Sequence, residues 1–338
     1  MRAWVVRRIG GLDAMDLEDI ERQPDQPGMV RIAVKAAAVN FFDTLQLAGT
    51  YQVRPDLPFI PGAEVAGLVV SAPADSGFRP GDRVLAVVGQ SGLVQGGYTE
   101  LTNAEPRRTV RIPDAMPFDE AAAFFVNYQT GWFGLHRRAS LRPGELVLVH
   151  AGAGGVGSAA IQIAKAAGAR VVATAGTTEK VALCRKLGAE LAIDYSQSDF
   201  AKEVNDFTDG RGADVIYDPV GGDVFERSTK CVAFEGRIVV VGFTSGRVPE
   251  VRANHALVKN YSVVGLHWGL YAERSPHLIP ECTAELLELY SDGKIRPLVS
   301  RRFPLEEARE ALATVASRRS TGKVVLVNEA GSQPSPPQ

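Results

Sequence analysis

Residues 146–157 read Leu-Val-Leu-Val-His-Ala-Gly-Ala-Gly-Gly-Val-Gly, and this stretch decides the fold. Four apolar residues predict a buried strand, and Gly152, Gly154 and Gly157 follow with G-x-G-x-x-G spacing where a helix begins. The first glycine permits a tight turn, the second lets the backbone approach a pyrophosphate, and the third lets helix and strand pack closely. The helix N-terminus offers free N–H groups to the phosphates. A glycine-rich turn without a ligand is the alternative, and the strand-turn-helix context disfavours it.

Strands and helices alternate around this loop. Short apolar runs predict strands at Glu145–His150, Arg170–Ala173, Leu191–Ile193, Ala213–Tyr217, Gly236–Val241 and Ser262–Gly265. The segments between them predict helices at Ser158–Ala167, Thr178–Leu187, Phe200–Phe207 and Val224–Val232, with Gly168 and Gly188 where helix C-caps favour glycine. Strands that alternate with helices predict an α/β domain with a parallel, doubly wound sheet, the Rossmann arrangement.

The flanking segments have other patterns. The first 120 residues are β-rich, with runs such as Val30–Val34 between Pro-Gly and Gly-Gly turns, which indicates a barrel or sandwich. An Ala-rich helical stretch, Asp119–Phe125, leads into the α/β domain. Residues 279–317 are helix-rich, Lys323–Val327 predicts a strand, and the Pro- and Ser-rich residues 329–338 predict a disordered tail. We therefore expect domains at 1–120 and 121–266, a C-terminal segment at 267–328 and the tail.

Composition excludes several classes of protein. The chain has 338 residues, a net charge of −2 and 22% charged residues, with the basic residues scattered, so a nucleic-acid-binding face is not expected. No apolar run approaches the roughly 18 residues of a membrane span, and the N-terminus does not resemble a secretory signal. Three widely spaced cysteines form no disulfide framework. We expect a cytoplasmic protein that binds no membrane.

The end of the second α/β strand selects the cofactor. Enzymes that use NAD usually carry an acidic residue there to bind the ribose hydroxyls, whereas this chain has Gly176. The absence of an acid leaves room for a 2′-phosphate. Thr177, Lys180 and, from the end of the next strand, Tyr195 can supply contacts to it. These residues favour NADPH over NADH, although Lys180 can also be read as a solvated residue in the first turn of a helix.

Several motifs make the chain resemble a known family over nearly its whole length, to about Asn328. They are Gly144-Glu145 with the glycine loop, Gln162 and Lys165; Val39–Thr44; Pro58–Gly67; Gly81–Val84; and Gly96–Tyr98. With these motifs the chain resembles the zinc-independent quinone oxidoreductases, the zeta-crystallin branch of the medium-chain dehydrogenase/reductases. The resemblance implies a GroES-like β-rich catalytic domain, an inserted Rossmann domain, a C-terminal return to the catalytic domain, an active site in the cleft between them, and a homodimer joined through the Rossmann sheets.

The resemblance also implies the site residues. Those at the nicotinamide end would be Asn40, Asp43, Tyr51 and Thr130, with Gly242, Phe243 and Thr244 passing beside the ring. Gly155 and Val156 would lie on the pyrophosphate, and Gly176, Lys180 and Tyr195 would hold the adenosine phosphate. The chain departs from some relatives at Leu45, where they carry a tyrosine that faces the pocket.

No metal site is expected. Zinc-dependent relatives use Cys, His and Cys as ligands, with a Gly-His-Glu motif, whereas the matching positions here are Asn40, Ala63 and Val126, and Glu64 alone is retained from that motif. Alanine and valine cannot ligate a metal, and the five histidines are dispersed without ligand spacing.

These observations predict an enzyme that transfers hydride from NADPH to a quinone or other α,β-unsaturated carbonyl compound. Such acceptors are electrophilic enough to react without a metal. Asn40, Tyr51 and Thr130 are the candidates that orient or hydrogen-bond the carbonyl, although they can also be a turn cap, a pocket wall and a helix cap. Aromatic residues can stack on a flat substrate or pack in the core: Phe125, Tyr128, Trp132, Phe243, Trp268 and Tyr271.

Two alternatives remain open. A 2-enoyl thioester or alkenal can accept the same hydride, with Arg54 and Arg7-Arg8 as a thin candidate for a basic patch. A structural or RNA-binding protein that binds NADPH is the non-enzymatic alternative, because some relatives serve such roles.

Overall fold

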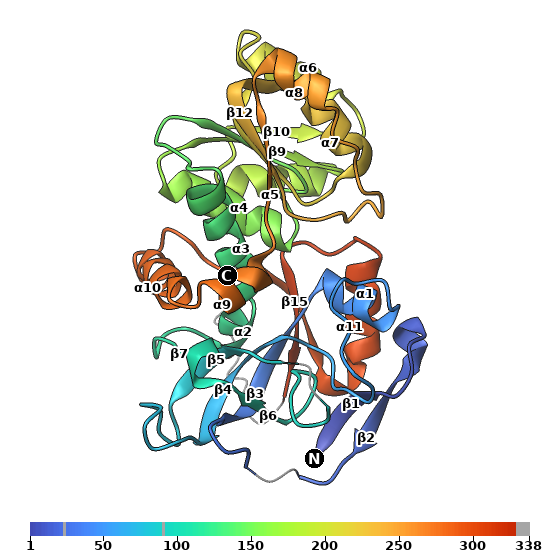
Figure 1. Cartoon of the computed structure of the whole chain (residues 1–338), viewed down its shortest axis with the longest axis vertical. Coiled ribbons are helices and arrows are strands. Elements are labelled where there is room, and N and C mark those ends of the chain that lie inside the picture. The colour runs from blue at the N-terminus through green and yellow to red at the C-terminus, as the bar shows by residue number, and fades with distance from the viewer. Residues whose placement is uncertain (23–24, 90–91, 329–338) are drawn as a thin grey trace. The chain divides into compact units, whose positions relative to one another are not determined.

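Six parallel strands form the sheet that carries the glycine loop. In the computed structural model (Figure 1), which describes residues 1–22, 25–89 and 92–328, strand pairing gives the order β10-β9-β8-β11-β12-β13. The strands are β8 (Leu146–Val149), β9 (Arg170–Ala175), β10 (Leu191–Asp194), β11 (Ala213–Asp218), β12 (Val232–Val240) and β13 (Ser262–Gly265). The strand order reverses between β8 and β11, so the predicted doubly wound fold is confirmed, and ligands of such sheets bind at this switch point.

Helices connect these strands: α4 (Gly155–Ala166), α5 (Thr178–Leu187), α6 (Phe200–Phe207), α7 (Gly222–Ser228) and α8 (Ala253–Lys259). Gly188 caps α5 in the left-handed conformation with φ 116°, as expected. The helix predicted at Val224–Val232 is too long, because α7 ends at Ser228. The chain then turns with Cys231 N–H on Ser228 O, and Val232 pairs with Ala213 as the first residue of β12.

The chain divides into two units. The first unit contains residues 1–126 and 297–338, and the second contains residues 127–296. Residues 267–296, which the sequence placed in the C-terminal return, therefore lie in the second unit. Hydrogen bonds explain this: α9 (Trp268–Arg274) and α10 (Leu278–Ser291) bond to α3 (Phe125–Trp132) through Trp268 to Gln129, Gln129 to Thr283, and Trp132 to Glu285. A π-helical segment, Phe133–Arg138, follows α3.

A mostly antiparallel sheet forms the first unit, in the order β14-β15-β3-β4-β5-β7, with β6 paired to β3 and a separate β1-β2 pair. Its elements are β1 (Arg2–Val6), β2 (Met15–Asp19), β3 (Val30–Val39), α1 (Phe41–Leu47), β4 (Glu64–Ser71), β5 (Arg83–Val87), β6 (Leu101–Ala104), β7 (Thr109–Arg111), α2 (Phe118–Ala122), β14 (Val299–Pro304), α11 (Ala308–Ala316) and β15 (Lys323–Val327), with short 3-10 turns at Gly11–Ala14, Pro106–Arg108 and Leu305–Glu307. Strand β14 lies within residues 279–317, which the sequence predicted to be rich in helix. A strand forms there because the backbone of β14 pairs in parallel with β15 and Phe303 packs into the core.

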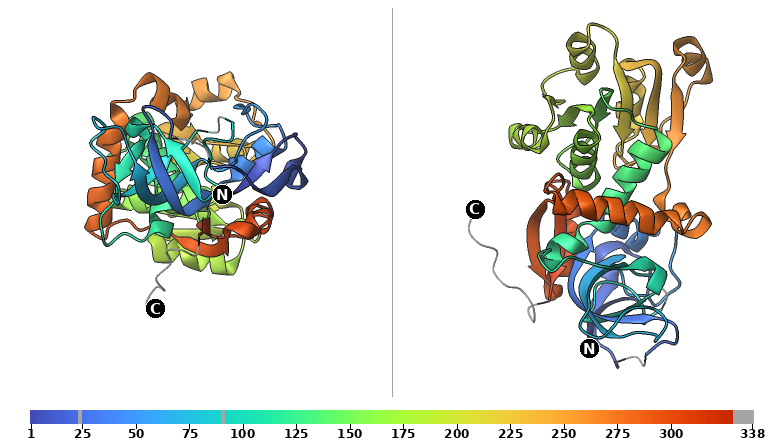
Figure 2. Two further views of the ribbon diagram at one scale, coloured as in Figure 1. Left: turned by 90° about the horizontal axis from the view of Figure 1, so that it is seen from below. Right: turned by 90° about the vertical axis from the view of Figure 1, so that its left-hand side faces the viewer.

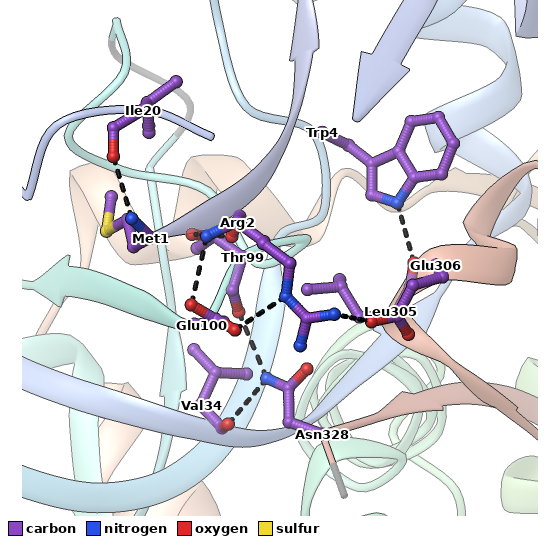
Figure 3. Close-up of polar contacts among 10 residues, drawn as sticks. All are labelled: Met1, Arg2, Trp4, Ile20, Val34, Thr99, Glu100, Leu305, Glu306 and Asn328. Carbon is purple, nitrogen blue, oxygen red and sulfur yellow. Dashed lines mark hydrogen bonds and ion pairs between the residues drawn. The ribbon is translucent and has the colours of Figure 1, made fainter. Parts of the chain in front are cut away.

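The C-terminal segment joins the N-terminal strands in this unit, as Figure 2 shows. Strand β15 pairs antiparallel with β3. Trp4 donates its indole N–H to Leu305 O at 2.7 Å, Arg2 pairs with Glu306, and the amide of Asn328 donates to Val34 O at 2.7 Å (Figure 3). The return of the chain to its starting sheet therefore rests on specific buried and surface contacts. The predicted tail, residues 329–338, lies outside the described residues.

Within the described part of the chain, no helix is long and apolar enough to cross a membrane.

Candidate functional site

The glycine loop joins β8 to α4, but its glycines act differently from the expectation. The residue in the left-handed conformation is Ala151, with φ 50°, and not Gly152. A Cβ on Gly152 would lie 2.9 Å from both Ala173 Cβ and Cys184 Sγ, and one on Gly157 would collide with the carbonyl of Ala151. Gly152 and Gly157 are thus required by close packing of loop, strand and helix.

Gly154 occupies the N-cap of α4, so no side chain caps the first turn. The first two residues of this twelve-residue helix, Gly155 and Val156, are partly exposed. The N–H groups of its first turn have no intrahelical acceptors. Together with the helix dipole they can bind an anion, and the binding of a pyrophosphate at this loop stays a prediction.

The ends of β9 and β10 bring Gly176 and Tyr195 together. Tyr195 N–H bonds to Ala175 O at 3.1 Å, and a Cβ on Gly176 would lie 2.5 Å from the Tyr195 hydroxyl. Thr177 is the N-cap of α5, where its hydroxyl accepts from Lys180 N–H at 3.3 Å. Tyr195 is 51% exposed and Lys180 is half-buried. Four of the residues predicted to bind the adenosine phosphate therefore lie along one edge of the sheet.

Residues 242–244 follow β12 at the same edge. Thr244 N–H bonds to Pro219 O at 3.1 Å, and a Cβ on Gly221 would lie 2.8 Å from the Phe243 ring. Gly242, Phe243 and Thr244 are thus held against the turn that follows β11, and all three are partly exposed. The predicted cofactor residues of the second unit come together at the carboxyl ends of β8, β9, β10 and β12.

A buried histidine stands directly after β8. His150 Nδ1 lies 3.0 Å from the Thr174 hydroxyl and Nε2 lies 2.8 Å from the Ser228 hydroxyl. Because Ser228 donates its own proton to Val224 O, it accepts from Nε2–H, and Thr174 donates to Nδ1. Burial, with a smaller contribution from Arg227, lowers the pKa of His150 to about 3. The imidazole is therefore a neutral link between strands and helix beneath the loop.

In the first unit, Asn40 lies at the junction of β3 and α1 and is 7% exposed. Its Nδ2 donates to Glu64 Oε1 at 2.9 Å, and its Oδ1 accepts from Lys323 Nζ at 2.6 Å. Lys323 also donates to Glu64 Oε1 at 3.0 Å, while Glu64 Oε2 accepts from Val126 N–H at 2.7 Å. Asn40 is the N-cap of α1 and forms a capping box with Asp43, and the same side chain is also bound in an ionic network.

Asp43 supports this arrangement from within α1. Its Oδ2 accepts from the backbone N–H of Asn40 and from the hydroxyl of Tyr98, each at 2.8 Å. The side chain is fully buried, and burial raises the pKa of Asp43 to about 7 against the opposing effect of these hydrogen bonds. In this structure Asp43, predicted to bind the cofactor, holds Asn40 and Tyr98 instead of presenting its carboxyl group at the surface.

The two other predicted catalytic residues lie apart in the chain. Tyr51 follows α1 in the first unit, is partly exposed and stacks on Phe42 with ring centroids 5.5 Å apart. Burial raises the pKa of its phenol, and the charge of Asp43 adds to the shift. Thr130 lies in the middle of α3, in the second unit, and is 7% exposed, so it does not cap a helix.

Most of the predicted aromatic cluster belongs to packing within the second unit. Trp132 donates its indole N–H to Glu285, and Trp268 donates its indole N–H to Gln129. Tyr128 accepts from Gln162, and Tyr271 stacks on Phe133.

The three cysteines are buried, and burial raises the pKa of each thiol. Among the described residues, no group of three or more His, Cys, Asp or Glu side chains could hold a metal ion.

Comparison with family models identifies both units. Residues 26–114 match the alcohol dehydrogenase GroES-like domain, and residues 155–288 match the family described as zinc-binding dehydrogenase. A GroES-like domain together with a six-stranded parallel sheet defines an enzyme of the medium-chain dehydrogenase/reductase superfamily.

Individual relatives refine this assignment. A quinone oxidoreductase-like protein 2 homolog of Nematostella vectensis is 41% identical over 88% of this chain and 81% of its own length. A quinone oxidoreductase of Pseudomonas aeruginosa is 37% identical over 94% and 97%. The structure of Escherichia coli quinone oxidoreductase complexed with NADPH has a TM-score of 0.87 at 31% identity and covers 97% of this chain and 100% of its own. The chain belongs to the quinone oxidoreductase-like branch of the superfamily.

Sequence reasoning missed two polar residues at these sites. Lys323 is the first residue of an otherwise apolar strand, and its isolation among valines and a leucine was the available signal. His150 is one of the five dispersed histidines. Its position directly before the glycine loop indicated a place at the carboxyl end of β8, but its two partners are 24 and 78 residues away in sequence.

Proposed function

We propose that this enzyme is a reductase that transfers hydride from NADPH to a quinone or another α,β-unsaturated carbonyl compound without zinc. The observation that carries the proposal is the pairing of an uncapped glycine-loop helix with an acid-free strand end at Gly176. An acidic residue at that strand end would repel a 2′-phosphate, whereas glycine, Lys180 and Tyr195 accommodate it. Three relatives of known structure, from a mycobacterium, Escherichia coli and Thermus thermophilus, are described as complexed with NADPH, which supports the same choice.

The residues that would hold the cofactor follow from this geometry. Gly155 and Val156 would donate backbone N–H groups to the pyrophosphate, and Thr177, Lys180 and Tyr195 would surround the 2′-phosphate. Gly242, Phe243 and Thr244 would contact the cofactor from the turn after β12. The nicotinamide, when bound, supplies the hydride, and the chain's own residues bind and orient the reactants.

Asn40 is our candidate to stabilise the oxyanion that develops when hydride reaches a conjugated carbonyl, because its side-chain amide offers an N–H donor. An N–H donor aimed at developing negative charge lowers the barrier because it needs no reorganisation during the reaction. Tyr51 and Thr130 carry hydroxyl groups that can orient the carbonyl or the carboxamide. Asn40, Ala63 and Val126 offer no ligand set for zinc, so the acceptor must be electrophilic without a metal.

The test is oxidation of NADPH by the purified protein with a panel of quinones, enones, alkenals and 2-enoyl-CoA thioesters. We expect turnover with small quinones or enones and none with simple alcohols in the reverse direction. Preference for enoyl thioesters would instead assign the alternative substrate class. NADPH binding without turnover on any acceptor would favour a structural or RNA-binding role.

We also propose a homodimer joined at strand β13, the edge of the parallel sheet. Next to this strand in sequence, α8 leaves Leu257 and Val258 77% and 78% exposed, which is unusual for adjacent large apolar residues. A second copy pairing along the edge would cover them. Sedimentation should show a dimer, and Leu257→Glu with Val258→Glu should shift it to a monomer, whereas a wild-type monomer would refute the proposal.

A further inference from the structure

Asn40, Glu64 and Lys323 form a closed triangle of hydrogen bonds inside the first unit. They come from the β3–α1 junction, from β4 and from β15, and they are 7%, 1% and 5% exposed. The three sides are Lys323 Nζ to Asn40 Oδ1 at 2.6 Å, Asn40 Nδ2 to Glu64 Oε1 at 2.9 Å, and Lys323 Nζ to Glu64 Oε1 at 3.0 Å. Each side pairs a donor with an acceptor.

The triangle permits one orientation of the Asn40 amide. An ammonium group has only donors and a carboxylate has only acceptors. Lys323 therefore requires the carbonyl oxygen of Asn40 on its side, and Glu64 requires the NH₂ group on the other. The inverted amide would place Nδ2 against the ammonium and Oδ1 against the carboxylate, and both contacts would be repulsive in a buried site.

The fixed amide has one donor left over. Asn40 Nδ2 carries two hydrogens and Glu64 accepts one, and no hydrogen bond within the described part of the chain involves the other. The carbonyl oxygen accepts from Lys323 and, in the capping box of α1, from the backbone N–H of Asp43, so both of its lone pairs are used. The only group that Asn40 can offer to a ligand is consequently an N–H, which suits a developing oxyanion or a carboxamide oxygen.

We propose that Lys323 is a positioning residue for hydride transfer: it holds Asn40 Oδ1 and so makes Asn40 present an N–H donor to the ligand. The inference rests on the proposed function for its effect on turnover, but the orientation of the amide is measurable separately. Lys323 acts through Asn40 and is not itself assigned a contact with substrate or cofactor.

Glu64→Gln provides the background that isolates the contribution of Lys323. In that variant Lys323 Nζ and Asn40 Nδ2 both still need an acceptor, so the carbonyl of the new side chain at position 64 turns towards them and the N–H of Val126 loses its acceptor. Lys323 still requires Oδ1 and keeps the native orientation. In the double variant Glu64→Gln/Lys323→Met the ammonium is absent, the NH₂ group at position 64 donates to Asn40 Oδ1, and the amide inverts.

The double variant also protects the test against loss of folding. Lys323→Met alone would leave the Glu64 carboxylate buried without its cation, a change that strongly destabilises a folded chain. Removing both charges together restores neutrality. Lys294→Met is the matched control, because Lys294 pairs with Asp292 on the surface with a side chain that is 56% exposed.

Two measurements are made on the wild type, the Glu64→Gln variant, the double variant and the control. The first is kcat and KM for NADPH with the best acceptor. The second is the nuclear Overhauser pattern of the Asn40 Nδ2 hydrogens in protein labelled at asparagine nitrogen and methionine methyl groups, with Asn40→Ser to assign the signal. Thermal unfolding verifies that each variant is folded.

We expect the double variant to lose roughly 10- to 100-fold in kcat, because an oxyanion donor is misdirected. The KM for NADPH should change by less than about twofold, since uniform binding is retained. The Nδ2 hydrogens should contact the methionine methyl group introduced at position 323 in the double variant, and Glu64→Gln and the control should keep the wild-type pattern of contacts between Asn40 and residue 64.

Wild-type kcat in the folded double variant, or Nδ2 hydrogens that still contact residue 64 there, would overturn the proposal. If the wild-type protein reduces none of the acceptors, the proposed function fails and the Overhauser measurement alone decides: contacts that move to the methyl group at position 323 support the positioning role, and unmoved contacts refute it.

Discussion

The Tyr195 hydroxyl lies directly over Gly176, so that a Cβ at residue 176 would lie 2.5 Å from it. The carboxyl ends of β9 and β10 bring the two residues together, where Tyr195 N–H bonds to Ala175 O. In the proposed function, the pair borders the space that a cofactor phosphate would occupy beside Lys180. A side chain at position 176 must therefore displace the phenol before it can act on a ligand by its charge.

Gly176→Asp should raise the ratio of the dissociation constants of NADPH and NADH by roughly tenfold or more, because a carboxylate next to a 2′-phosphate is repulsive. Gly176→Ala is the matched control, since it adds the same Cβ against Tyr195 without charge. The control should weaken both cofactors alike. Fluorescence titration measures both constants, and an unchanged ratio in Gly176→Asp, or equal wild-type affinity for NADH and NADPH, contradicts the assignment.

Lys180→Ala should weaken NADPH by about 1.5–3 kcal/mol through loss of one charge-assisted contact, and should leave NADH nearly unaffected. Lys186→Ala serves as control because Lys186 lies on the same helix, α5, and is exposed. Calorimetric titration with both cofactors measures the loss of affinity for NADPH and for NADH separately. Equal losses for NADPH and NADH would show that Lys180 acts on the helix and not on the phosphate.

Purified protein should contain no stoichiometric zinc, and chelators should leave its activity unchanged. The physical reason is that Ala63 and Val126 carry no donor atoms and Asn40 is already bound to Glu64 and Lys323. Elemental analysis after dialysis is the measurement. One zinc per chain, with activity that chelation removes and zinc restores, would overturn the prediction and the reaction class with it.

Acidification should destabilise the second unit through His150. Its pKa is lowered to about 3 in the folded chain, below the roughly 6.5 of an unfolded histidine. Between these values the unfolded state binds more protons, so the free energy of unfolding falls as the pH drops. From pH 7.5 to 5 the contribution is about 2 kcal/mol.

Denaturant unfolding of wild type and His150→Gln at both pH values isolates this contribution. The variant should be less stable at pH 7.5, because it loses the bonds to Thr174 and Ser228, but should lose about 2 kcal/mol less than wild type on acidification. The same pH dependence in both proteins would mean that His150 is not buried in its neutral form.

Tyr51→Phe should lower kcat with a quinone by roughly 10- to 100-fold, because the hydroxyl contributes orientation or one hydrogen bond. The phenylalanine keeps the stacking on Phe42, where the ring centroids are 5.5 Å apart, so the change removes only the hydroxyl group. Steady-state kinetics together with NADPH titration measures the effect. Complete loss of activity with intact NADPH binding would identify Tyr51 as an obligatory proton donor.

The elements of the second unit, and the sheet edge at which the proposed cofactor residues lie, could be predicted because their signals are local. Short apolar runs, Gly188 at a helix end and the glycine spacing after β8 each report on a few neighbouring residues, and the carboxyl ends of parallel strands necessarily meet at one edge. The limits of this reasoning appear at β14 and α7. In both places pairing with another strand, β15 or β11, decided the conformation.

By itself, the sequence determined the doubly wound sheet, the glycine loop and the acid-free strand end at Gly176. Only the tertiary structure decided that Asp43 is buried against Tyr98 and that Lys323 binds Asn40 and Glu64. Lys323 lies 283 residues from Asn40 and 259 from Glu64 in sequence. Their contact depends on the register of β15 on β3 and of β3 on β4, and strand register is fixed by the packing of side chains from distant segments, which no local pattern contains.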